Sequence, residues 1–292
     1  MAVATVGFFD GVHIGHRYLL QKLQTMAKEL NTGSVVFSFS VSPRRILHSD
    51  YIPQLLTTKE ERLQLLQQTG VDRVVMLDFE RLQHLTAHDF LCMIHHDYGV
   101  DTLLMGYDHR FGSDGLTAFA DYEKASVGTG VGLLQMEQYA EERVSSTLIR
   151  NLLSEGNVEE ANHLLGYSYC IAGKVVEGKH IGRTLGFPTA NIKLLSQDKL
   201  LPMAGVYKVL VYLQNESYAG LLNIGTNPTV GNNRLSIEVY IVGFDKNIYG
   251  EPIEVHLLSF VRKECRFGSL EALQQQIKQD LASLHIRQGA DF

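Results

Sequence analysis

The sequence predicts two domains of different fold class: an α/β domain built on a parallel sheet, followed by a small antiparallel β-barrel with a C-terminal helix. In the first half of the chain, strand-like apolar runs alternate strictly with helical patterns. Such alternation is typical of a parallel sheet covered on both faces. In the second half, short strand-like runs follow one another between glycine, asparagine and proline turns, and a helical pattern returns only near the end. Several short strands in succession indicate an antiparallel barrel.

The composition fits a two-domain protein and argues against several classes of partner. The chain has 292 residues, of which 45% are hydrophobic, and this supports a full core. A net charge of −6 gives no reason to expect a nucleic acid or an anionic membrane surface as partner. There is no apolar run long enough to span a membrane and no signal peptide with a basic start. We therefore expect no nucleic-acid or membrane partner, and a monomer or weak homo-oligomer.

The cysteines indicate the compartment. Cys92, Cys170 and Cys265 are far apart in the sequence and lack the spacing of a metal site. Their number is odd, which argues against a disulfide framework and favours packed thiols in a reducing cytoplasm. The first strand-like run begins almost at Met1, so either the chain starts there or a preceding segment has been trimmed.

The first motif is the segment Gly7–His16, which joins the apolar run Val3–Val6 to a helical pattern over 17–30. A turn between a strand and a helix presents free backbone N–H groups and the positive end of the helix. Both favour the binding of phosphate. His13 and His16 can add donors or positive charge there. The alternative is a histidine pair that only caps the helix and packs. We favour a nucleotide-phosphate site with these further residues: Gly7, Phe8, Phe9, Asp10 and Gly11.

The elements that follow build the same sheet. The capping box Thr58–Glu61 opens one helix, and Thr86 caps another. In parallel sheets, ligands bind beyond the carboxyl ends of the strands, where the turns after successive strands lie. The remaining strand-like runs cover 35–39, 74–77, 101–106 and 130–136.

Two later segments belong near the first turn. Gly106 and Asp108 lie in a glycine-flanked loop after the run 101–106, where the backbone can approach a ligand; the alternative is an ordinary loop with a salt bridge. Ser146 and Thr147 open a helix, where hydroxyls either cap the helix or help to bind an anion. Arg150, one turn further on, suits a clamp on phosphate.

The second domain begins near Gly166. The helical pattern over 147–165, interrupted at Gly156 and Asn157, closes the first domain, so we predict domains over 1–166 and 167–292. Ser269 caps the terminal helix, which covers 270–284. The strand-like runs between them cover 169–176, 205–213, 218–224, 235–244 and 253–261.

The most specific motif of the chain is the run 178–191, a glycine-rich loop that leads into Pro-Thr-Ala-Asn. In an extended chain, residues two apart share a face, so Thr189 and Asn191 offer two neutral oxygens together. That donor pair suits Mg²⁺, which keeps phosphate oxygens among its ligands. The alternative is a turn that uses both side chains for local hydrogen bonds. The sequence has no Gly-x4-Gly-Lys-Ser/Thr motif, so a kinase here is not a P-loop enzyme.

Glu238 is the only acid in the apolar run 235–241 and lies on the face opposite Ile237 and Val239. A glutamate that simply faces solvent from a strand is the alternative to a functional residue. A hydroxyl nucleophile needs a base within hydrogen-bond reach, and a carboxylate can supply one.

These motifs together resemble the bacterial bifunctional riboflavin kinase/FAD synthetases over essentially the whole chain. The first half carries their Gly-x-Phe-Asp-Gly-Val-His-x-Gly-His start, their Gly-x-(Asn/Asp)-x-x-Phe-Gly loop and their Ser-Ser-Thr-x-Ile-Arg helix start, in that order. The second half carries the riboflavin kinase run 178–191 and further matches at 201–207 and 223–229. The resemblance implies a Rossmann-like nucleotidyltransferase domain, which adenylylates FMN, followed by a riboflavin kinase barrel.

The resemblance also implies roles for the second domain. Riboflavin and ATP would give FMN and ADP in the barrel, with Glu238 as the base and Thr189 and Asn191 as the metal ligands. The flavin would lie toward the terminal helix and its approach. Residues implied for nucleotide binding are Gly178, His180, Gly182, Arg183 and Pro188, and those implied for flavin binding are Arg262, Phe267 and Leu270.

In the first domain, the resemblance implies that FMN and ATP give FAD and pyrophosphate. The phosphate of FMN is already an anion near neutral pH, so this reaction needs charge stabilisation rather than a base. Mg²⁺ would serve both domains by bridging phosphates. The residues suited to charge stabilisation are His13, His16, Asp108, Thr147 and Arg150.

One position departs from the family pattern. Family members carry Pro-His-Pro after the second strand, whereas this chain has Ser42 in place of the histidine, which removes one potential donor on the phosphate side. This leaves two other readings open. One is a riboflavin kinase with a weak or inactive adenylyltransferase domain. The other is a non-catalytic regulator that binds flavin or nucleotide. The presence of Glu238, Thr189 and Asn191 argues against it.

Overall fold

The computed structural model divides into two compact units, Met1–Ser146 and Thr147–Phe292. It describes residues 1–48, 50, 52, 54–107, 109–136, 144–178, 182, 186–226 and 235–284. The sequence predicts a domain boundary near Gly166, whereas the two compact units divide after Ser146. The boundary near Gly166 stays a prediction. Each unit is described by itself.

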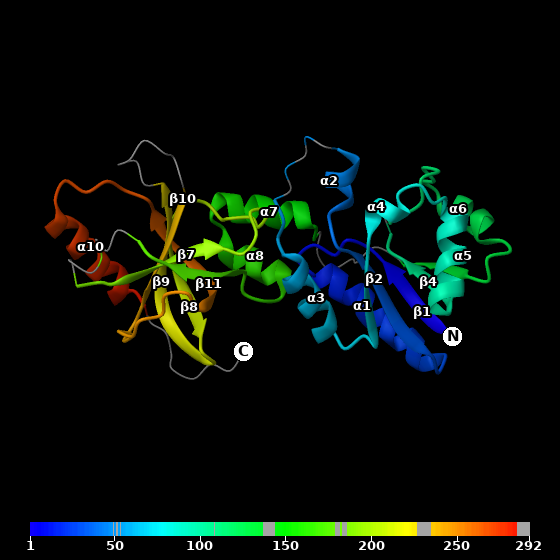
Figure 1. Ribbon diagram of the computed structural model, residues 1–292, viewed down its shortest axis with the longest axis horizontal. Helices are drawn as coiled ribbons and strands as arrows, with labels where there is room; N and C mark the ends of the chain where they lie inside the picture. Colours follow the sequence, from blue (N-terminus) through cyan, green and yellow to red (C-terminus); the bar gives the residue numbers. More distant parts are fainter. Residues whose placement is uncertain are drawn as a thin grey trace. The chain divides into compact units, whose positions relative to one another are not determined.

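The first unit is built on a five-stranded sheet with the order β3-β2-β1-β4-β5, and every described strand pair in it is parallel. This confirms the predicted Rossmann-like fold. Figure 1 shows the sheet with its helices. The strands are β1 (Ala2–Val6), β2 (Gly33–Phe39), β3 (Arg73–Leu77), β4 (Val100–Met105) and β5 (Gly132–Gln135). The helices are α1 (Ile14–Glu29), α2 (Pro43–Leu47), α3 (Lys59–Gln68), α4 (Phe79–Leu82), α5 (Ala87–Tyr98) and α6 (Phe119–Ser126).

The sheet has a buried apolar cluster on each of its faces. All residues of β1 are buried. Successive residues of a strand point to opposite faces, and Val36 and Phe37 of β2 accordingly belong to different core clusters. Leu20 of α1 packs in the cluster of Val36, whereas Ile94 of α5 packs in that of Phe37.

The strand order brings two of the predicted loops together. From β1 the chain adds β2 and then β3 on one side, and then places β4 and β5 on the other side of β1. The order therefore reverses between β1 and β4, and ligands bind beyond the carboxyl ends of the strands at such a reversal. The turn beginning at Gly7 follows β1, and the turn beginning at Gly106 follows β4. Both predicted loops thus leave the same edge at the reversal point.

The second unit is a closed barrel with the order β10-β7-β6-β11-β8-β9, in which every described strand pair is antiparallel. This confirms the predicted antiparallel barrel with a C-terminal helix (Figure 1). Its strands are β6 (Cys170–Val176), β7 (Thr189–Leu194), β8 (Gly205–Leu213), β9 (Glu216–Thr226), β10 (Leu235–Ile241) and β11 (Pro252–Lys263). Its helices are α7 (Ser146–Glu155, whose first residue is the last of the first unit), α8 (Val158–Leu165) and α10 (Leu270–Ala282).

Alternation along the strands fills the barrel with apolar side chains. In β10, Ile237, Val239 and Ile241 are buried, whereas Glu238 and Tyr240 between them are partly exposed. Polar groups of the strands consequently lie on the outer wall. Among the described residues of the chain, no helix is both long enough and apolar enough to cross a membrane.

Candidate active sites

The first turn has an unusual backbone. Phe9, Gly11 and Val12 all have positive φ angles, of 54°, 81° and 37°. A positive φ angle is strained in a residue that has a side chain. It persists only where the surrounding structure holds the backbone in that conformation. Phe9 and Val12 are both buried, and the Val12 N–H donates to the Phe9 carbonyl at 3.0 Å. A Cβ on Gly7 would lie 2.9 Å from the Phe9 ring, so this position requires glycine.

Asp10 fastens this turn to a segment distant in sequence. Its buried carboxylate accepts hydrogen bonds from the backbone N–H groups of Leu56 and Thr57 and from the Thr57 hydroxyl, at 3.0 to 3.1 Å. The Gly11 N–H donates in turn to Thr57 Oγ1 at 3.1 Å. The structure thus shows Asp10 positioning the turn, and its predicted contact with nucleotide stays a prediction.

His13 and His16 lie together at the start of α1. His13 caps the helix: its Nδ1 accepts from the His16 N–H at 3.3 Å, so the proton of a neutral His13 ring lies on Nε2. The two rings stack with centroids 3.6 Å apart, and the edge of Phe9 meets His16 at 5.2 Å. Burial, and to a smaller extent the neighbouring His13, hold the pKa of His16 well below its usual range. His16 is therefore a neutral donor and acceptor near pH 7.

Ser146, the last residue of the first unit and the first of α7, is bound to this turn. Ser146 Oγ donates to the Asp10 carbonyl at 2.9 Å. A Cβ on Gly15 would lie 2.8 Å from Val144, so the segment before Ser146 also packs closely on the turn. Thr147 and Arg150 follow on the same helix but belong to the second compact unit. Asp108 lies outside the described residues.

Arg62 of α3 is a residue that the sequence reasoning missed. It is fully buried, its Nη2 donates to the Phe39 carbonyl at 2.6 Å, and its guanidinium lies 4.2 Å from the centre of the Phe8 ring. Its Nε and Nη1 are buried without a hydrogen-bond partner among the described residues. Burial lowers the pKa of Arg62, while the nearby Asp10 opposes that shift. A buried cation with unused donors is costly unless it meets an anion.

The carboxyl end of β2 also carries the altered family position. Ser38 Oγ donates to the Phe8 carbonyl at 3.1 Å and so joins β2 to the first turn. Ser42 is buried and precedes α2, but its side chain makes no capping hydrogen bond to that helix. Two serines thus lie at this end of the strand, and Ser38 is bound to the turn.

In the barrel, the strand register brings three predicted residues together. Strands β7 and β10 are antiparallel neighbours, with Glu238 directly opposite Asn191 and Tyr240 opposite Thr189. Thr189 Oγ1 donates to Glu238 Oε2 at 3.2 Å. Residues opposite or diagonal on one face of an antiparallel pair have side chains within reach of each other. The predicted base and both predicted metal ligands therefore share one patch of the outer wall.

Two described glycines of the glycine-rich run, Gly178 and Gly182, lie close to this patch. A Cβ on Gly178 would lie 2.0 Å from Asn191 Nδ2, so a larger residue here would have to displace that amide or the backbone. A Cβ on Gly182 would lie 2.3 Å from the Phe187 carbonyl and 3.3 Å from Thr189 Oγ1, and the Phe187 N–H donates to the Gly182 carbonyl at 2.8 Å. Pro188 directly precedes β7. His180 and Arg183, also predicted in this loop, lie outside the described residues.

Two family models match the chain in the order of these two sites. The model of FAD synthetase matches residues 1–148, and the model of riboflavin kinase matches residues 165–286. The chain belongs to the bifunctional riboflavin kinase/FMN adenylyltransferase family.

Curated relatives and a solved structure support this membership. A bifunctional riboflavin kinase/FMN adenylyltransferase of Escherichia coli K12 is 39% identical over 95% of this chain and 90% of its own length. The protein of the same name from Pseudomonas fluorescens is 38% identical over 96% and 91%. A crystal structure described as a macrolide-efflux protein from Streptococcus pneumoniae superposes with a TM-score of 0.86 at 33% identity, covering 96% of this chain and 92% of that chain.

The outer-wall patch of Thr189, Asn191 and Glu238, called the kinase patch below, has donors that fit Mg²⁺, the metal that we expect with ATP. Thr189 and Asn191 offer neutral oxygens beside the Glu238 carboxylate. Mg²⁺ prefers oxygen ligands and keeps several positions for water and phosphate, so few protein ligands suffice. The Thr189 hydroxyl can donate to Glu238 and still present its lone pairs to a cation.

At the predicted flavin end of the kinase domain, Arg262 is held by the terminal helix. Its guanidinium binds the buried Asp280 carboxylate, with N–O distances of 2.9 to 3.2 Å, and lies 5.7 Å from the centre of the Phe267 ring. Gln276 donates to the same carboxylate at 2.9 Å. Arg262 therefore docks α10 against β11. Leu270, which opens α10, is exposed. A direct contact of Arg262, Phe267 or Leu270 with flavin stays a prediction.

Proposed function

We propose that this chain makes FMN from riboflavin in its barrel and FAD from FMN in its α/β domain, using ATP in both reactions. The observation that carries this proposal is the joining of Thr189 and Glu238 by a hydrogen bond, with Asn191 directly opposite, in a chain whose two halves match the two families. The alternative of a non-catalytic regulator gives no reason for this arrangement.

In the kinase reaction, Glu238 accepts the proton of riboflavin's primary hydroxyl as that oxygen attacks the γ-phosphorus of ATP, and ADP leaves. Thr189 donates to the Glu238 carboxylate and so fixes the oxygen that faces it. The Gly178–Asn191 contact holds the loop against this patch, where the loop covers the nucleotide and excludes water.

Thr189 and Asn191 would hold Mg²⁺, which supplies charge neutralisation on the phosphate oxygens. The support for this proposal is the donor chemistry of the two side chains and their common face on β7.

In the adenylyltransferase reaction, a phosphate oxygen of FMN attacks the α-phosphorus of ATP, and pyrophosphate leaves. The nucleophile is already an anion near pH 7, so the turn needs to stabilise charge and not to remove a proton. The N–H groups at the start of α1 and the Nε2–H of His13 are donors for the phosphates. His16, held neutral by burial, donates without adding charge. Thr147, Arg150 and Asp108 are assigned to the same reaction by resemblance.

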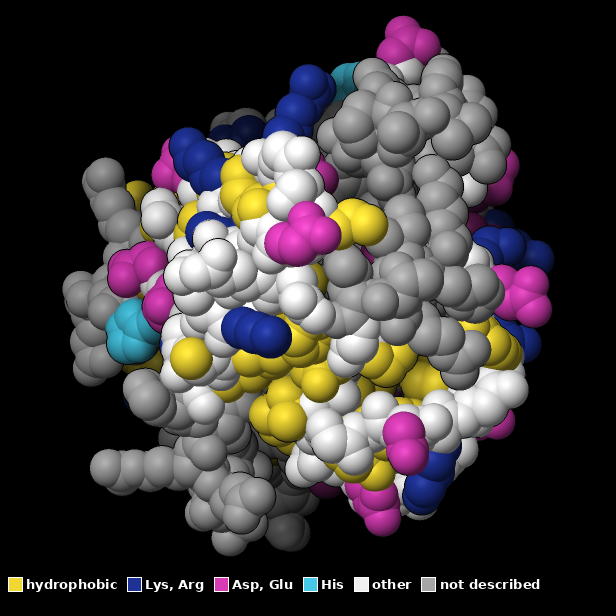
Figure 2. Space-filling view, turned by 90° about the vertical axis from the view of Figure 1, so that its left-hand side faces the viewer, with side chains coloured by type: hydrophobic (Ala, Val, Ile, Leu, Met, Phe, Trp, Pro, Cys, Tyr) yellow, Lys and Arg dark blue, Asp and Glu magenta, His cyan; other side chains and the backbone are white. Residues whose placement is uncertain are grey.

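The flavin of the kinase reaction is proposed to lie on the side of α10. Figure 2 looks onto that side, and hydrophobic side chains gather across the middle of the visible face, with acidic and basic side chains scattered around them. An apolar surface with a polar rim suits a flat aromatic ring carrying a polar chain. The chain is further proposed to work in the cytoplasm as a monomer or weak homo-oligomer, without a nucleic-acid or membrane partner.

A kinase with a weak adenylyltransferase domain is the second candidate, and Ser42 is the observation that favours it. The serine is buried where the family carries a histidine, and it makes no capping hydrogen bond. It therefore supplies no ring donor at the carboxyl edge of the sheet.

One assay separates these functions. The full chain is incubated with riboflavin, ATP and Mg²⁺, and riboflavin, FMN and FAD are separated by chromatography. FAD supports the bifunctional enzyme, and FMN alone supports the kinase with a weak first domain. If neither product forms while flavin or nucleotide still binds, the protein is a binding protein and the proposal is wrong.

A further inference from the structure

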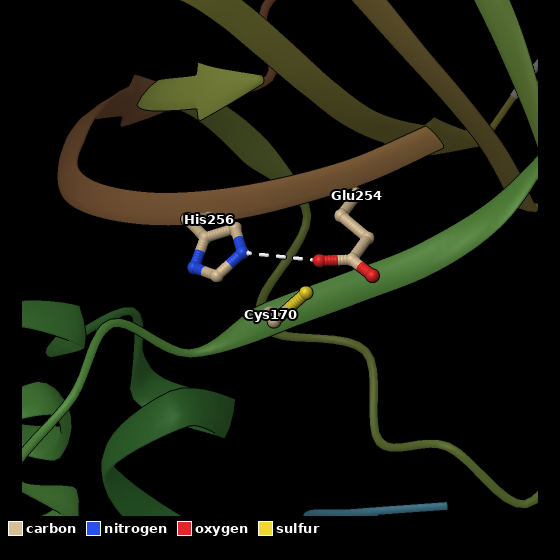
Figure 3. A group of neighbouring side chains, drawn as sticks. All are labelled: Cys170, Glu254 and His256. Atoms are coloured by element: carbon tan, nitrogen blue, oxygen red, sulfur yellow. Dashed lines mark ion pairs between the residues drawn. The ribbon is translucent and has the colours of Figure 1, made fainter. Parts of the chain in front are cut away.

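Three side chains with metal-binding chemistry meet on the outer wall of the barrel. Cys170 of β6 lies directly opposite His256 of β11, and Glu254 is two residues before His256 on the same face of that strand. One ligand atom from each lies within 4.8 Å of the others. Figure 3 shows the thiol, the imidazole and the carboxylate pointing toward one another. No spacing along the chain predicts this group, because antiparallel pairing joins residues that are far apart in the sequence.

The imidazole and the carboxylate already have the spacing of ligands in a tetrahedral metal site, and the thiol lies within 4.8 Å of both. Zinc binds thiolate sulfur at about 2.3 Å and imidazole nitrogen or carboxylate oxygen at about 2.0 to 2.2 Å, which puts neighbouring ligand atoms about 3.5 Å apart. His256 Nε2 and Glu254 Oε2 are already 3.6 Å apart. Small rotations of exposed or half-buried side chains can bring all three atoms to these distances.

The ligand types select the kind of metal. Mg²⁺ and Ca²⁺ prefer oxygen, whereas a thiol and an imidazole suit borderline ions such as Zn²⁺ or Co²⁺. Three protein ligands leave one tetrahedral position for water. The surroundings leave room: the residue opposite Glu254 on β6 is the small Ala172. The Tyr212 ring meets His256 at 4.8 Å and steadies the imidazole.

The group is separate from the kinase patch. In the barrel, β6 lies between β7 and β11. The residue of β6 opposite Asn191 is Val176, at the other end of the strand from Cys170. Six residues of a strand span about 20 Å, so this cluster and the proposed Mg²⁺ ligands are distinct. None of its members takes part in either proposed reaction.

We propose that Cys170, Glu254 and His256 bind one divalent transition-metal ion of the zinc type on the outer wall of the barrel. The ion joins β6 to β11 and stabilises the folded chain by mass action, because the unfolded chain does not hold the three ligands together. A thiolate is the ligand that binds the metal, so binding releases the thiol proton and weakens as pH falls.

Cobalt(II) is the probe, because thiolate ligation gives it an intense near-ultraviolet charge-transfer absorption that oxygen and nitrogen ligands do not give. Co²⁺ is titrated into the full chain, into Cys170→Ser, and into the matched controls Cys92→Ser and Cys265→Ser. We expect one equivalent to bind with this absorption in the wild type and both controls, and the absorption to vanish in Cys170→Ser. We expect His256→Gln to weaken binding at least tenfold.

Other outcomes overturn the proposal. They are no absorption in the wild type, an unchanged absorption in Cys170→Ser, or its loss only in Cys92→Ser. The last result would assign the ion to the Cys92–His88 pair of α5, whose Sγ and Nε2 are 3.6 Å apart. A second measurement guards against a misfolded variant: Zn²⁺ should raise the Tm of the wild type but not that of Cys170→Ser, while riboflavin phosphorylation stays the same in both.

Discussion

Glu238 and Thr189 form the contact on which the proposed kinase mechanism rests. The Thr189 hydroxyl donates to the carboxylate at 3.2 Å, and Glu238 is partly exposed. A general base in this position contributes about 10²- to 10⁴-fold in rate.

The first prediction concerns that base. Glu238→Gln keeps the shape of the side chain but cannot take up a proton, so riboflavin phosphorylation should fall by about 10²-fold or more. Formation of FAD from supplied FMN should be unchanged, which chromatography of both reactions measures. Glu251→Gln, in the turn before β11, is the control and should keep both activities. Loss of both activities in Glu238→Gln would contradict two separate sites.

His16 predicts a pH dependence of stability. Its pKa is lowered in the folded state, mainly by burial. As pH falls below the unfolded value of about 6.5, the unfolded chain takes up a proton that the native chain does not, so stability falls. The slope from one such group is at most about 1.4 kcal/mol per pH unit.

The measurement is the free energy of unfolding in urea between pH 7.5 and 5.5, for the wild type and His16→Asn. The wild type should lose stability relative to the variant as pH falls. If the free energies of unfolding of the wild type and the variant change equally with pH, folding does not lower the pKa of His16. The variant should also make less FAD from FMN while riboflavin phosphorylation stays the same.

We expect a substitution of Arg62 to reduce FAD formation without a matching loss of stability. Replacing a buried charge with an apolar side chain of similar volume is often neutral or stabilising, and removing one partner of an interaction is costly. Because two of its nitrogens have no partner among the described residues, Arg62→Met should change the free energy of unfolding by less than about 2 kcal/mol. FAD formation should fall at least tenfold, with a higher KM for FMN or ATP.

Kinetics well below the Tm test this expectation, with Arg62→Lys as the conservative variant that should recover part of the activity. If the loss of FAD formation only follows the unfolded fraction, Arg62 is structural and has no contact with the reacting phosphates.

Among the elements, the loop before β7 depends on the absence of side chains. In Gly178→Ala the new Cβ would lie 2.0 Å from Asn191 Nδ2, so the amide or the backbone at residue 178 must move. Riboflavin phosphorylation should fall tenfold or more, whereas FAD formation from FMN should not change. Gly33→Ala of β2 has no atom within 4 Å of the new Cβ and is the matched control. Equal activity of Gly178→Ala and wild type would show that the loop does not need this contact.

Elements with local signals were predicted well. The Thr58–Glu61 capping box, the Thr86 cap and the break at Gly156 are all present, because caps and positive φ angles depend on a few neighbouring residues. The short helices α2 and α4 were not predicted, since five and four residues are too short to show a helical period. Strand β7 was expected only as extended chain.

The candidate sites divide in the same way. Thr189, Asn191 and Glu238 come together as strand alternation and the family motif predict. The hydrogen bond between Asp10 and Thr57 joins residues 47 positions apart in the sequence, and that between Arg62 and Phe39 joins residues 23 positions apart. Such contacts come from tertiary packing, which no local pattern in one sequence reports.

At the scale of the whole molecule, two reactions in two compact units should allow two inactive variants to complement each other when they are mixed. Glu238→Gln should make little FMN, and His16→Ala should make FMN but little FAD. A mixture of both variants should make FAD from riboflavin, because FMN released by one protein is the substrate of the other. Chromatography of the mixture and of each variant alone tests this. No FAD from the mixture, although each variant keeps its other reaction, would show that FMN passes between sites without release.

The closed ring of six strands has a consequence for how this enzyme can change. In an open sheet, an end strand can slip by one residue at modest cost, whereas a strand in a ring has a partner on each side. A slip of β10 by one position would turn Glu238 to the interior and Val239 to the outer wall. Insertions within β7 or β10 should therefore silence phosphorylation even in proteins that still fold, while the loops between strands remain free to vary in length.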